Sequence, residues 1–258
     1  MISAADIAAE LAAATRERRE LAPFTDQHPD LDLDSAYAAQ LAGIQIRLDA
    51  GERVVGAKLG LTSKAKQRVM NVDAPLHGLV TSGMLHPYGE PVDVSSLIHP
   101  RVEPEIAFLL GREVEAPATV TSVLAATEAV FCAIDVLDSR YENFRFTLPD
   151  VVADNASAGL FLMGPRALTP AEAGDLALLG CALRVDGEVV ATAAGAAVMG
   201  HPAASVAWLV NQLAARKQRL EAGWLVFSGG LTEPVPLAPG TVVTAEFAGL
   251  GTVEVVGR

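Results

Sequence analysis

The N-terminal stretch of the chain carries apolar positions at helical spacing. One stripe predicts a helix over residues 3–20 that Ser3 can cap, and a second predicts a helix over residues 35–49 that stops at Gly51. The repeating positions are Ile7, Leu11 and Ala14 in the first stripe and Tyr37, Leu41, Ile44 and Leu48 in the second. We therefore expect residues 1–53 to form a helical segment that packs on the rest of the chain.

The pattern changes at residue 54, where short apolar runs bounded by glycine and proline replace the helical stripes. These runs predict a mixed α/β domain with a β-rich core over residues 54–258, with no repeat or linker that divides it. We expect strands at 54–61, 101–110, 131–138, 179–185, 188–192, 224–228, 241–247 and 252–256, a hairpin turn at Asp186-Gly187, and helices at 62–70, 120–130 and 202–220.

Two glutamates lie close together in the strand expected at 101–110. Because side chains alternate across a strand, Glu103 and Glu105 project from the same face. Adjacent carboxylates on a buried strand are tolerated when one is protonated, when bases pair with them, or when a cation lies between them. The simpler alternative is a pair of solvated glutamates on an edge strand, with Pro104 marking the edge.

Two further charged residues interrupt apolar strands. A lone buried carboxylate such as Asp135 is unfavourable unless it is compensated, and Asp138 falls on the opposite face of the same strand. Lys58 is either an edge lysine that discourages strand pairing or an acid–base group near a bound substrate. Together with the two glutamates, Asp135 would supply three hard oxygen ligands of the kind that Mg²⁺ prefers.

A polar stretch over residues 139–159 follows the second acidic strand. Its small hydrogen-bonding residues, among them Asn155 and Ser157, are typical of an ordinary turn. The same residues would equally present an amide and a hydroxyl to the carboxylate of a ligand. The sequence alone leaves these two interpretations open.

Composition and charge remove several classes of function. Apolar residues make up 51% of the chain, which is typical of a globular protein. The net charge of −12 argues against a nucleic-acid-binding surface. Phosphate-loop, dinucleotide and nucleophile-elbow motifs are absent, and Cys132 and Cys181 lie in apolar runs as packed thiols. Residues 189–210 lack charge, but Gly200-His201-Pro202 breaks them, so we expect no membrane span and a cytoplasmic protein.

Four motifs in order resemble the fumarylacetoacetate hydrolase superfamily, in its hydratase/decarboxylase branch. Glu103-Pro104-Glu105 followed by Asp135 resembles the Glu-x-Glu…Asp/Glu metal motif, and GAKLGLTSK at 56–64 resembles the Lys-x-Gly-Leu-Thr-Ser element. DSRYENF at 138–144 and VADNAS at 152–157 extend the resemblance, which covers residues 35–258. Asp135 stands where this branch more often has glutamate, a longer ligand.

The resemblance implies a fumarylacetoacetate-hydrolase-like β-roll or sandwich with flanking helices and an enzyme that uses Mg²⁺, with Mn²⁺ as a substitute. It assigns Glu103, Glu105 and Asp135 as metal ligands and Lys58 as the residue that stabilises negative charge on the substrate. Ser157 and Asn155 are expected to hold the C1 carboxylate. Arg140 is a candidate for the distal carboxylate, and the alternative for Arg140 is a salt bridge to Asp138 or Glu142.

The implied activity is decarboxylation of 2-oxo-3-hexenedioate in aromatic meta-cleavage catabolism, with hydration of 2-oxopent-4-enoate as the alternative. Hydratases of the branch carry Asp-Tyr-Gly where this chain has Leu76-His77-Gly78, which favours the decarboxylase. A non-catalytic protein that binds oxo acids would not require three buried acids. The expected partners are a small 2-oxo acid or dicarboxylate substrate, further copies of the chain in a homo-oligomer, and the hydratase of the pathway in a complex.

Overall fold

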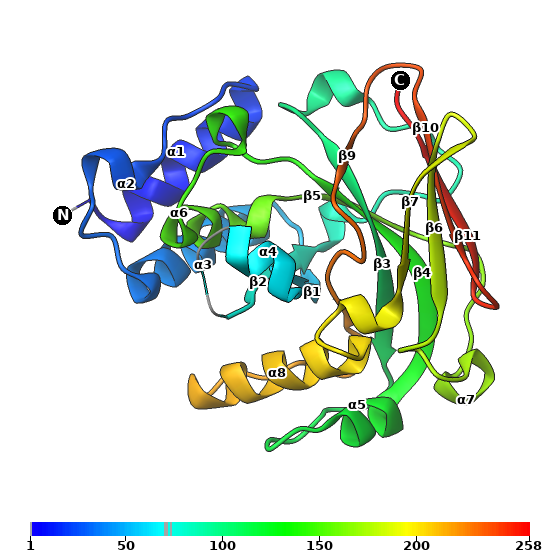
Figure 1. The fold of residues 1–258 in the computed structure, drawn as a ribbon. Helices are drawn as coiled ribbons and strands as arrows, with labels where there is room; N and C mark the ends of the chain where they lie inside the picture. Colours follow the sequence, from blue (N-terminus) through cyan, green and yellow to red (C-terminus); the bar gives the residue numbers. More distant parts are fainter. Residues whose placement is uncertain (1, 70–71, 73) are drawn as a thin grey trace.

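The computed structural model describes residues 2–69, 72 and 74–258, and three helices precede its first strand (Figure 1). They are α1 (Ala4–Glu17), α2 (Phe24–Gln27) and α3 (Leu33–Asp49). Ser3 caps α1 as predicted by accepting a hydrogen bond from the Asp6 amide, and the helix ends at Glu17 because Arg18 adopts a left-handed conformation. The division of the chain into two units at residue 53 stays a prediction.

The other helices are short, apart from the last. They are α4 (Lys64–Val69), α5 (Val120–Ala126), α6 (Leu148–Ala153), α7 (Pro170–Ala173) and α8 (Pro202–Ala215). The helix predicted over 120–130 is wrong in its second half, because residues 127–130 extend the following strand and pair with the end of its neighbour at Leu109 and Leu110. Among the described residues, no helix is long and apolar enough to cross a membrane.

Two sheets form the β-rich core. The larger has the strand order β2-β1-β8-β3-β4-β5, with β9 also paired to β3, and the smaller has the order β11-β10-β6-β7. The strands of the larger sheet are β1 (Val54–Gly60), β2 (Leu76–Thr81), β3 (Arg101–Leu110), β4 (Thr127–Leu137), β5 (Ala158–Met163), β8 (Leu225–Phe227) and β9 (Val235–Pro236). Those of the smaller sheet are β6 (Gly180–Val185), β7 (Glu188–Ala194), β10 (Val242–Phe247) and β11 (Gly251–Val256).

The strand β3 is central, not the edge that Pro104 suggested. It pairs with β4 along its whole length and, on its other side, with β9 at one end and β8 at the other. Proline is tolerated there because Pro104 lies between these two short pairings, opposite a loop whose Leu231 amide donates to the Pro104 carbonyl over 2.9 Å.

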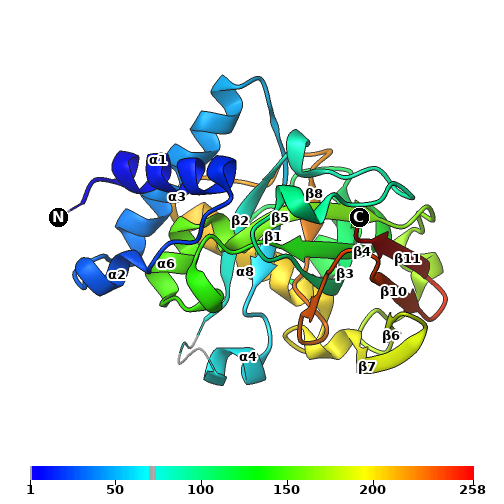
Figure 2. The same ribbon diagram turned by 90° about the horizontal axis from the view of Figure 1, so that it is seen from above.

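The two faces of the larger sheet are covered differently. One face packs on the smaller sheet and α8 through the main core, which joins Ile106 and Phe108 of β3 to Val243 and Ala245 of β10. The helices α1, α2, α3 and α6 gather on the other side of the larger sheet (Figures 1 and 2). Because Glu103 and Glu105 alternate with the residues of the main core, they face away from the smaller sheet.

Candidate active site

The acidic residues of β3 and β4 share one face of the larger sheet. Glu103 and Asp135 are direct cross-strand neighbours, and Glu105 lies two residues further along β3 on the same side. Glu105 and Asp135 are fully buried, and Glu103 retains 8% of its accessible surface. The strand register therefore brings together three carboxylates that are separated in the sequence.

Lys58 reaches the same face from β1. Its cross-strand neighbour is Phe227 of β8, which in turn lies opposite Ala107, the next residue of β3 on the acidic face. The Lys58 Nζ lies 2.6 Å from Asp135 Oδ2 and donates a hydrogen bond of 2.8 Å to the Ala156 carbonyl. This buried ammonium is the cation that the structure places directly beside Asp135.

The charged form of Glu105 is unfavourable in this site. Burial raises the pKa of Glu105 well above its ordinary value, the Asp135 carboxylate raises it further, and the Lys58 ammonium opposes both effects. Glu105 Oε2 accepts a hydrogen bond of 2.8 Å from the Gly229 amide, while its buried Oε1 has no hydrogen-bond partner among the described residues. Such a site favours a proton or a further cation.

Two glycines let the backbone approach these carboxylates. Gly229 has a φ of +106°, and a Cβ atom on Gly230 would lie 2.2 Å from Glu103 Oε2. A side chain at either position is therefore strained or displaces the carboxylate. As the side chains stand, no three acidic, histidine or cysteine residues of the described chain converge closely enough to hold a metal ion.

A cavity of about 170 Å³ opens above the charged residues. Lys58, Glu103 and Ser157 contribute to its surface, whereas Glu105 and Asp135 lie beneath it. Most of the remaining wall is apolar and comes from Leu61, Leu76, Leu137, Phe144, Phe146 and Val151. Low polarity around a buried ammonium strengthens its interaction with negative charge on a ligand.

The loop that bounds this cavity has an unusual backbone. Asn155, Ala156 and Ser157 all have a positive φ, a conformation that costs about 1–2 kcal/mol for each residue with a side chain. The side-chain amide of Asn155 fixes the position of the loop. Its Oδ1 accepts a hydrogen bond from the Leu79 amide and its Nδ2 donates one to the Leu79 carbonyl, each over 2.8 Å. The Ala156 carbonyl is thereby directed at Lys58.

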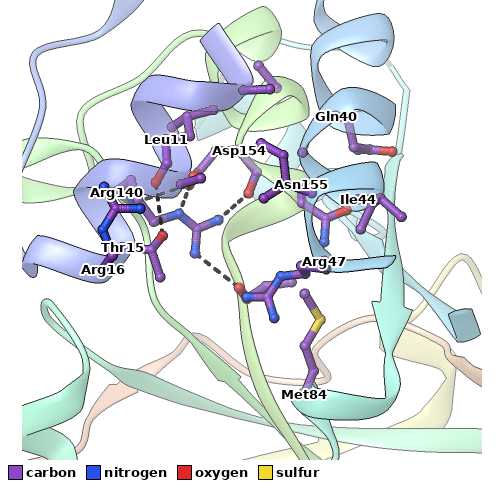
Figure 3. A pocket seen from close by; sticks show the side chains of 16 residues that line it. Leu11, Thr15, Arg16, Gln40, Ile44, Arg47, Met84, Arg140, Asp154 and Asn155 are labelled. Atoms are coloured by element: carbon purple, nitrogen blue, oxygen red, sulfur yellow. Dashed lines mark hydrogen bonds and ion pairs between the residues drawn. The ribbon is translucent and has the colours of Figure 1, made fainter. Parts of the chain in front are cut away.

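Arg140 clamps the same loop from the side away from the cavity (Figure 3). Its guanidinium pairs with the Asp154 carboxylate and donates to the carbonyls of Asp154, Asp138 (2.6 Å) and Ala158 (3.0 Å). Burial raises the pKa of Asp154 to about 6, although Arg140 lowers it. Arg140 therefore forms a salt bridge, the alternative to substrate binding, but its partner is Asp154 and not Asp138 or Glu142.

The structure thus separates the residues predicted from the sequence into two groups. Lys58, Glu103, Glu105, Asp135 and Ser157 gather at or beneath the cavity. Arg140 and Asn155 instead line a different pocket, between the loop and the N-terminal helices, together with Thr15, Gln40 and Met84 (Figure 3). Their predicted contacts with substrate carboxylates remain predictions, and the hydrogen bonds present here are to the protein.

His77 lies outside the cavity as well. It is opposite Leu59 in the β1–β2 pairing, on the face of β1 that Lys58 does not occupy, and its ring stacks on Tyr37 at 4.7 Å. Burial lowers the pKa of His77 to about 4, so the ring is neutral near pH 7. The sequence patterns mark Gly229-Gly230 as a tight backbone corner but assign neither Gly229 nor Asp154 to the site, although a Gly-Gly pair after a strand is a signal of close backbone approach.

Comparison with known proteins defines the class of this fold and site. A family model described as fumarylacetoacetate (FAA) hydrolase C-terminal matches residues 56–256, and the chain belongs to this family. The family and fold class predicted from the sequence are confirmed.

Individual proteins of known name also match the chain over most of its length. The chain is 44% identical over 237 residues to a 4-oxalocrotonate decarboxylase from Pseudomonas sp. (strain CF600), covering 91% of this chain and 89% of the relative. It is 40% identical over 245 residues to a 2-hydroxyhexa-2,4-dienoate hydratase from Comamonas testosteroni, covering 94% and 92%. A solved structure of 4-oxalocrotonate decarboxylase from Pseudomonas putida G7, complexed with magnesium and adipate, matches with a TM-score of 0.94 at 39% identity, covering 99% of this chain and 97% of that one.

Proposed function

We propose that this protein catalyses the Mg²⁺-dependent decarboxylation of 2-oxo-3-hexenedioate (4-oxalocrotonate) to 2-hydroxypenta-2,4-dienoate and CO₂. The observation that carries the proposal is the buried Lys58 ammonium, which lies beside Asp135 at the floor of an apolar cavity. The decarboxylases named above support the choice of substrate.

The donor set fits a hard divalent cation. Three carboxylates lie on adjacent strands, and Glu105 Oε1 is buried with no hydrogen-bond partner among the described residues. Cβ atoms of cross-strand neighbours are about 4.5–5.5 Å apart and diagonal ones about 7–8 Å, so side-chain rotation alone can bring oxygens of Glu103, Glu105 and Asp135 together. When bound, Mg²⁺, or Mn²⁺ in its place, polarises the 2-oxo group of the substrate.

The reaction requires stabilisation of a developing enolate. The bond between C5 and C6 breaks, C6 leaves as CO₂, and its electron pair moves through C4 and C3 to the 2-oxo oxygen, which then takes up one proton. The Lys58 ammonium has three N–H donors; one donates to the Ala156 carbonyl, and the Asp135 carboxylate lies 2.6 Å from the nitrogen as its counter-ion. We assign a further N–H donor of Lys58 to the oxygen on which negative charge develops.

Two residues of the loop have different parts in this scheme. Ser157 reaches the cavity surface, and its hydroxyl, which donates a hydrogen bond of 3.4 Å to Asp154 Oδ2 in the free protein, turns to donate to the C1 carboxylate in this scheme. Asn155 is a positioning residue, because its side-chain amide hydrogen-bonds to the backbone of Leu79 and so holds the strained loop in place. The apolar wall excludes water and preserves the strength of the Lys58 interaction.

Hydration of 2-hydroxypenta-2,4-dienoate is the second candidate. The hydratase from Comamonas testosteroni is almost as similar to this chain as the decarboxylases are, which favours keeping it. Both reactions pass negative charge to the same 2-oxo oxygen, so the polar residues identified here serve either one.

The test is to supply each substrate separately with Mg²⁺ and to follow CO₂ release and water addition. We expect CO₂ from 2-oxo-3-hexenedioate without hydration of the dienoate, and hydration without CO₂ would reverse the assignment. Lys58→Ala should abolish turnover, whereas replacement of the exposed Lys217 by Ala should not. Full Mg²⁺-dependent turnover by the Lys58→Ala variant would refute the role given to Lys58.

Self-association is part of the proposal. Helix α3 exposes Leu33, Leu41 and Ile46 by 40%, 43% and 42%, which supports contact with further copies of the chain. Sedimentation equilibrium of the purified protein, alone and mixed with the hydratase of the pathway, measures both assemblies.

A further inference from the structure

Arg101 lies at the outer end of the row of acidic residues on β3. Residues 101, 103 and 105 alternate onto one face, and their exposure increases outward from the fully buried Glu105 through Glu103 to the half-buried Arg101. The cross-strand neighbour of Arg101 is Leu137, whose side chain forms part of the cavity wall. Arg101 therefore stands on the cavity side of the sheet, beside Leu137 of the cavity wall.

The Arg101 side chain is oriented by a cavity residue. Its guanidinium carbon lies 4.0 Å from the ring centroid of Phe144, which lines the cavity. Stacking on a ring leaves the in-plane N–H groups of a guanidinium directed outward, in the arrangement that binds a carboxylate. No carboxylate of the described residues forms an ion pair with Arg101.

Lys58 and Arg140 are engaged elsewhere. Lys58 is the one basic residue among the described residues that line the cavity, and it lies at the inner end beside Asp135. The Arg140 guanidinium donates to the Asp154 carboxylate and to the carbonyls of Asp138 and Ala158, away from the cavity. Among the described residues, Arg101 therefore remains as a cation beside the cavity wall that forms no ion pair within the protein.

We infer that Arg101 binds the substrate carboxylate farther from Lys58 and so makes the site selective for dicarboxylates. The inference rests on the proposed function, which places the oxo-acid end of the substrate at the inner end of the cavity. Five carbon–carbon bonds of about 1.5 Å hold the carboxylates of a six-carbon diacid about 6–7 Å apart. One same-face step along a strand is also about 6.5–7 Å, which is the step from Glu103 to Arg101.

The carboxylate that Arg101 binds is the one that departs as CO₂. Its negative charge is present in the bound substrate and moves to the 2-oxo oxygen as the C5–C6 bond breaks. An ion pair with Arg101 therefore contributes to binding and does not stabilise the transition state. Loss of Arg101 should raise KM and leave kcat unchanged or slightly higher.

The experiment compares two ligands of equal length on the Mg²⁺-loaded protein by calorimetry, 2-oxoadipate as the diacid and 2-oxohexanoate as the monoacid. Arg101→Met should weaken the binding of 2-oxoadipate by about 10- to 100-fold and leave the affinity for 2-oxohexanoate unchanged. Arg101→Lys should fall between, because it keeps the charge and loses the planar fork. Arg145→Met is the matched control, since Arg145 lies next to Phe144 in the sequence but pairs with Asp26 and Glu142.

Each other outcome overturns a specific statement. Equal weakening of both acids by Arg101→Met would mean that Arg101 only supports Phe144, and a fall in kcat at constant KM would contradict ground-state binding. A wild-type preference for the diacid that survives Arg101→Met would refute the role of Arg101 and leave the proposed function standing. A wild-type protein that binds both acids alike would refute the dicarboxylate substrate, and the inference with it.

Discussion

Two clusters of buried charge lie on opposite sides of the loop at residues 155–157, and they differ in how completely their charges are paired. On the scaffold side, Arg140 meets the Asp154 carboxylate and three carbonyl oxygens. On the cavity side, the Lys58 ammonium lies beside Asp135, and the buried Glu105 Oε1 has no hydrogen-bond partner among the described residues. The same types of residue thus produce a closed cluster and an open one.

This difference separates structural from functional charge. A buried ion pair whose hydrogen bonds are complete needs no further ligand, and its loss is expressed mainly as stability. A cluster with excess charge is unstable by itself and becomes favourable when a proton or a cation joins it. Completeness of pairing, and not burial or charge alone, therefore indicates which cluster binds a ligand. Four substitutions test this conclusion.

The largest expected effect is that of Glu105→Gln on the cavity side. Removing one carboxylate from the metal set should lower Mg²⁺-dependent turnover by about 1,000-fold, the scale of several kcal/mol that a metal contributes. The ligand-free protein should not lose stability, because the pKa of Glu105 is raised by burial and by Asp135, so its charge is unfavourable there. A magnesium titration followed by thermal unfolding measures both quantities.

The control for this substitution is Glu188→Gln, since Glu188 is exposed at the start of β7. It should leave the magnesium midpoint and the turnover unchanged. A Glu105→Gln protein with the wild-type magnesium midpoint would show that the open cluster is not the metal site.

The second effect is that of Arg140→Gln on the scaffold side. Removing one partner of a buried pair should cost about 3–5 kcal/mol of unfolding free energy, because Asp154 is left buried without its cation. The loss should shrink at acidic pH, since without Arg140 the pKa of Asp154 rises above about 6 and the neutral acid needs no partner. Urea unfolding at two pH values gives both results.

The double variant Arg140→Gln with Asp154→Asn should recover part of the lost stability. A stably folded Arg140→Gln protein with selectively weakened binding of the diacid would instead support the interpretation made from the sequence, in which Arg140 binds the distal carboxylate of the substrate.

The two clusters also differ in how far the sequence reveals them. Alternation along β3 predicts that Glu103 and Glu105 share a face, and the apolar run around Asp135 predicts that it is buried. The direct opposition of Glu103 and Asp135 depends on strand register, which no local pattern specifies here. The family resemblance assigns both residues to the metal set without that register.

The partner of Arg140 could not be predicted from its neighbours in the sequence. Asp138 and Glu142 are its neighbours in the sequence, but Asp154 reaches it because the loop that follows turns through three left-handed residues. Two of these, Ala156 and Ser157, are residue types that rarely adopt a left-handed conformation, so they do not predict such a turn. The pairing is a property of tertiary structure and becomes visible only with the loop conformation.

A smaller effect comes from His77, a titratable group buried on the far side of β1. Burial lowers the pKa of His77 to about 4, so the unfolded chain binds a proton near pH 6.5 that the folded protein does not. The stability associated with neutral His77 is therefore complete above pH 6.5 and is lost as the pH falls toward 4. The loss is about 3 kcal/mol across this window.

His77→Phe keeps a ring beside Tyr37 and removes the titration. Relative to the wild type, this variant should lose less stability between pH 7 and pH 4.5 in urea unfolding, while His28→Phe should behave like the wild type. An unchanged pH dependence in His77→Phe would mean that the ring is accessible to protons in the folded protein and that its burial does not set its charge.

The smallest effect concerns Glu233, an exposed acid that lines the cavity. It is neither part of the closed cluster nor buried with the open one, and its carboxylate repels a dianionic substrate only through solvent. Glu233→Gln should therefore tighten 2-oxoadipate binding by about two- to threefold, the scale of an exposed charge pair. The gain should disappear at high ionic strength, whereas the effect of Arg101→Met should persist in part because the guanidinium is half-buried against Phe144. A tenfold change at Glu233 would show that charge at the rim is as strongly coupled to the substrate as charge on the floor, and exposure would then no longer distinguish them.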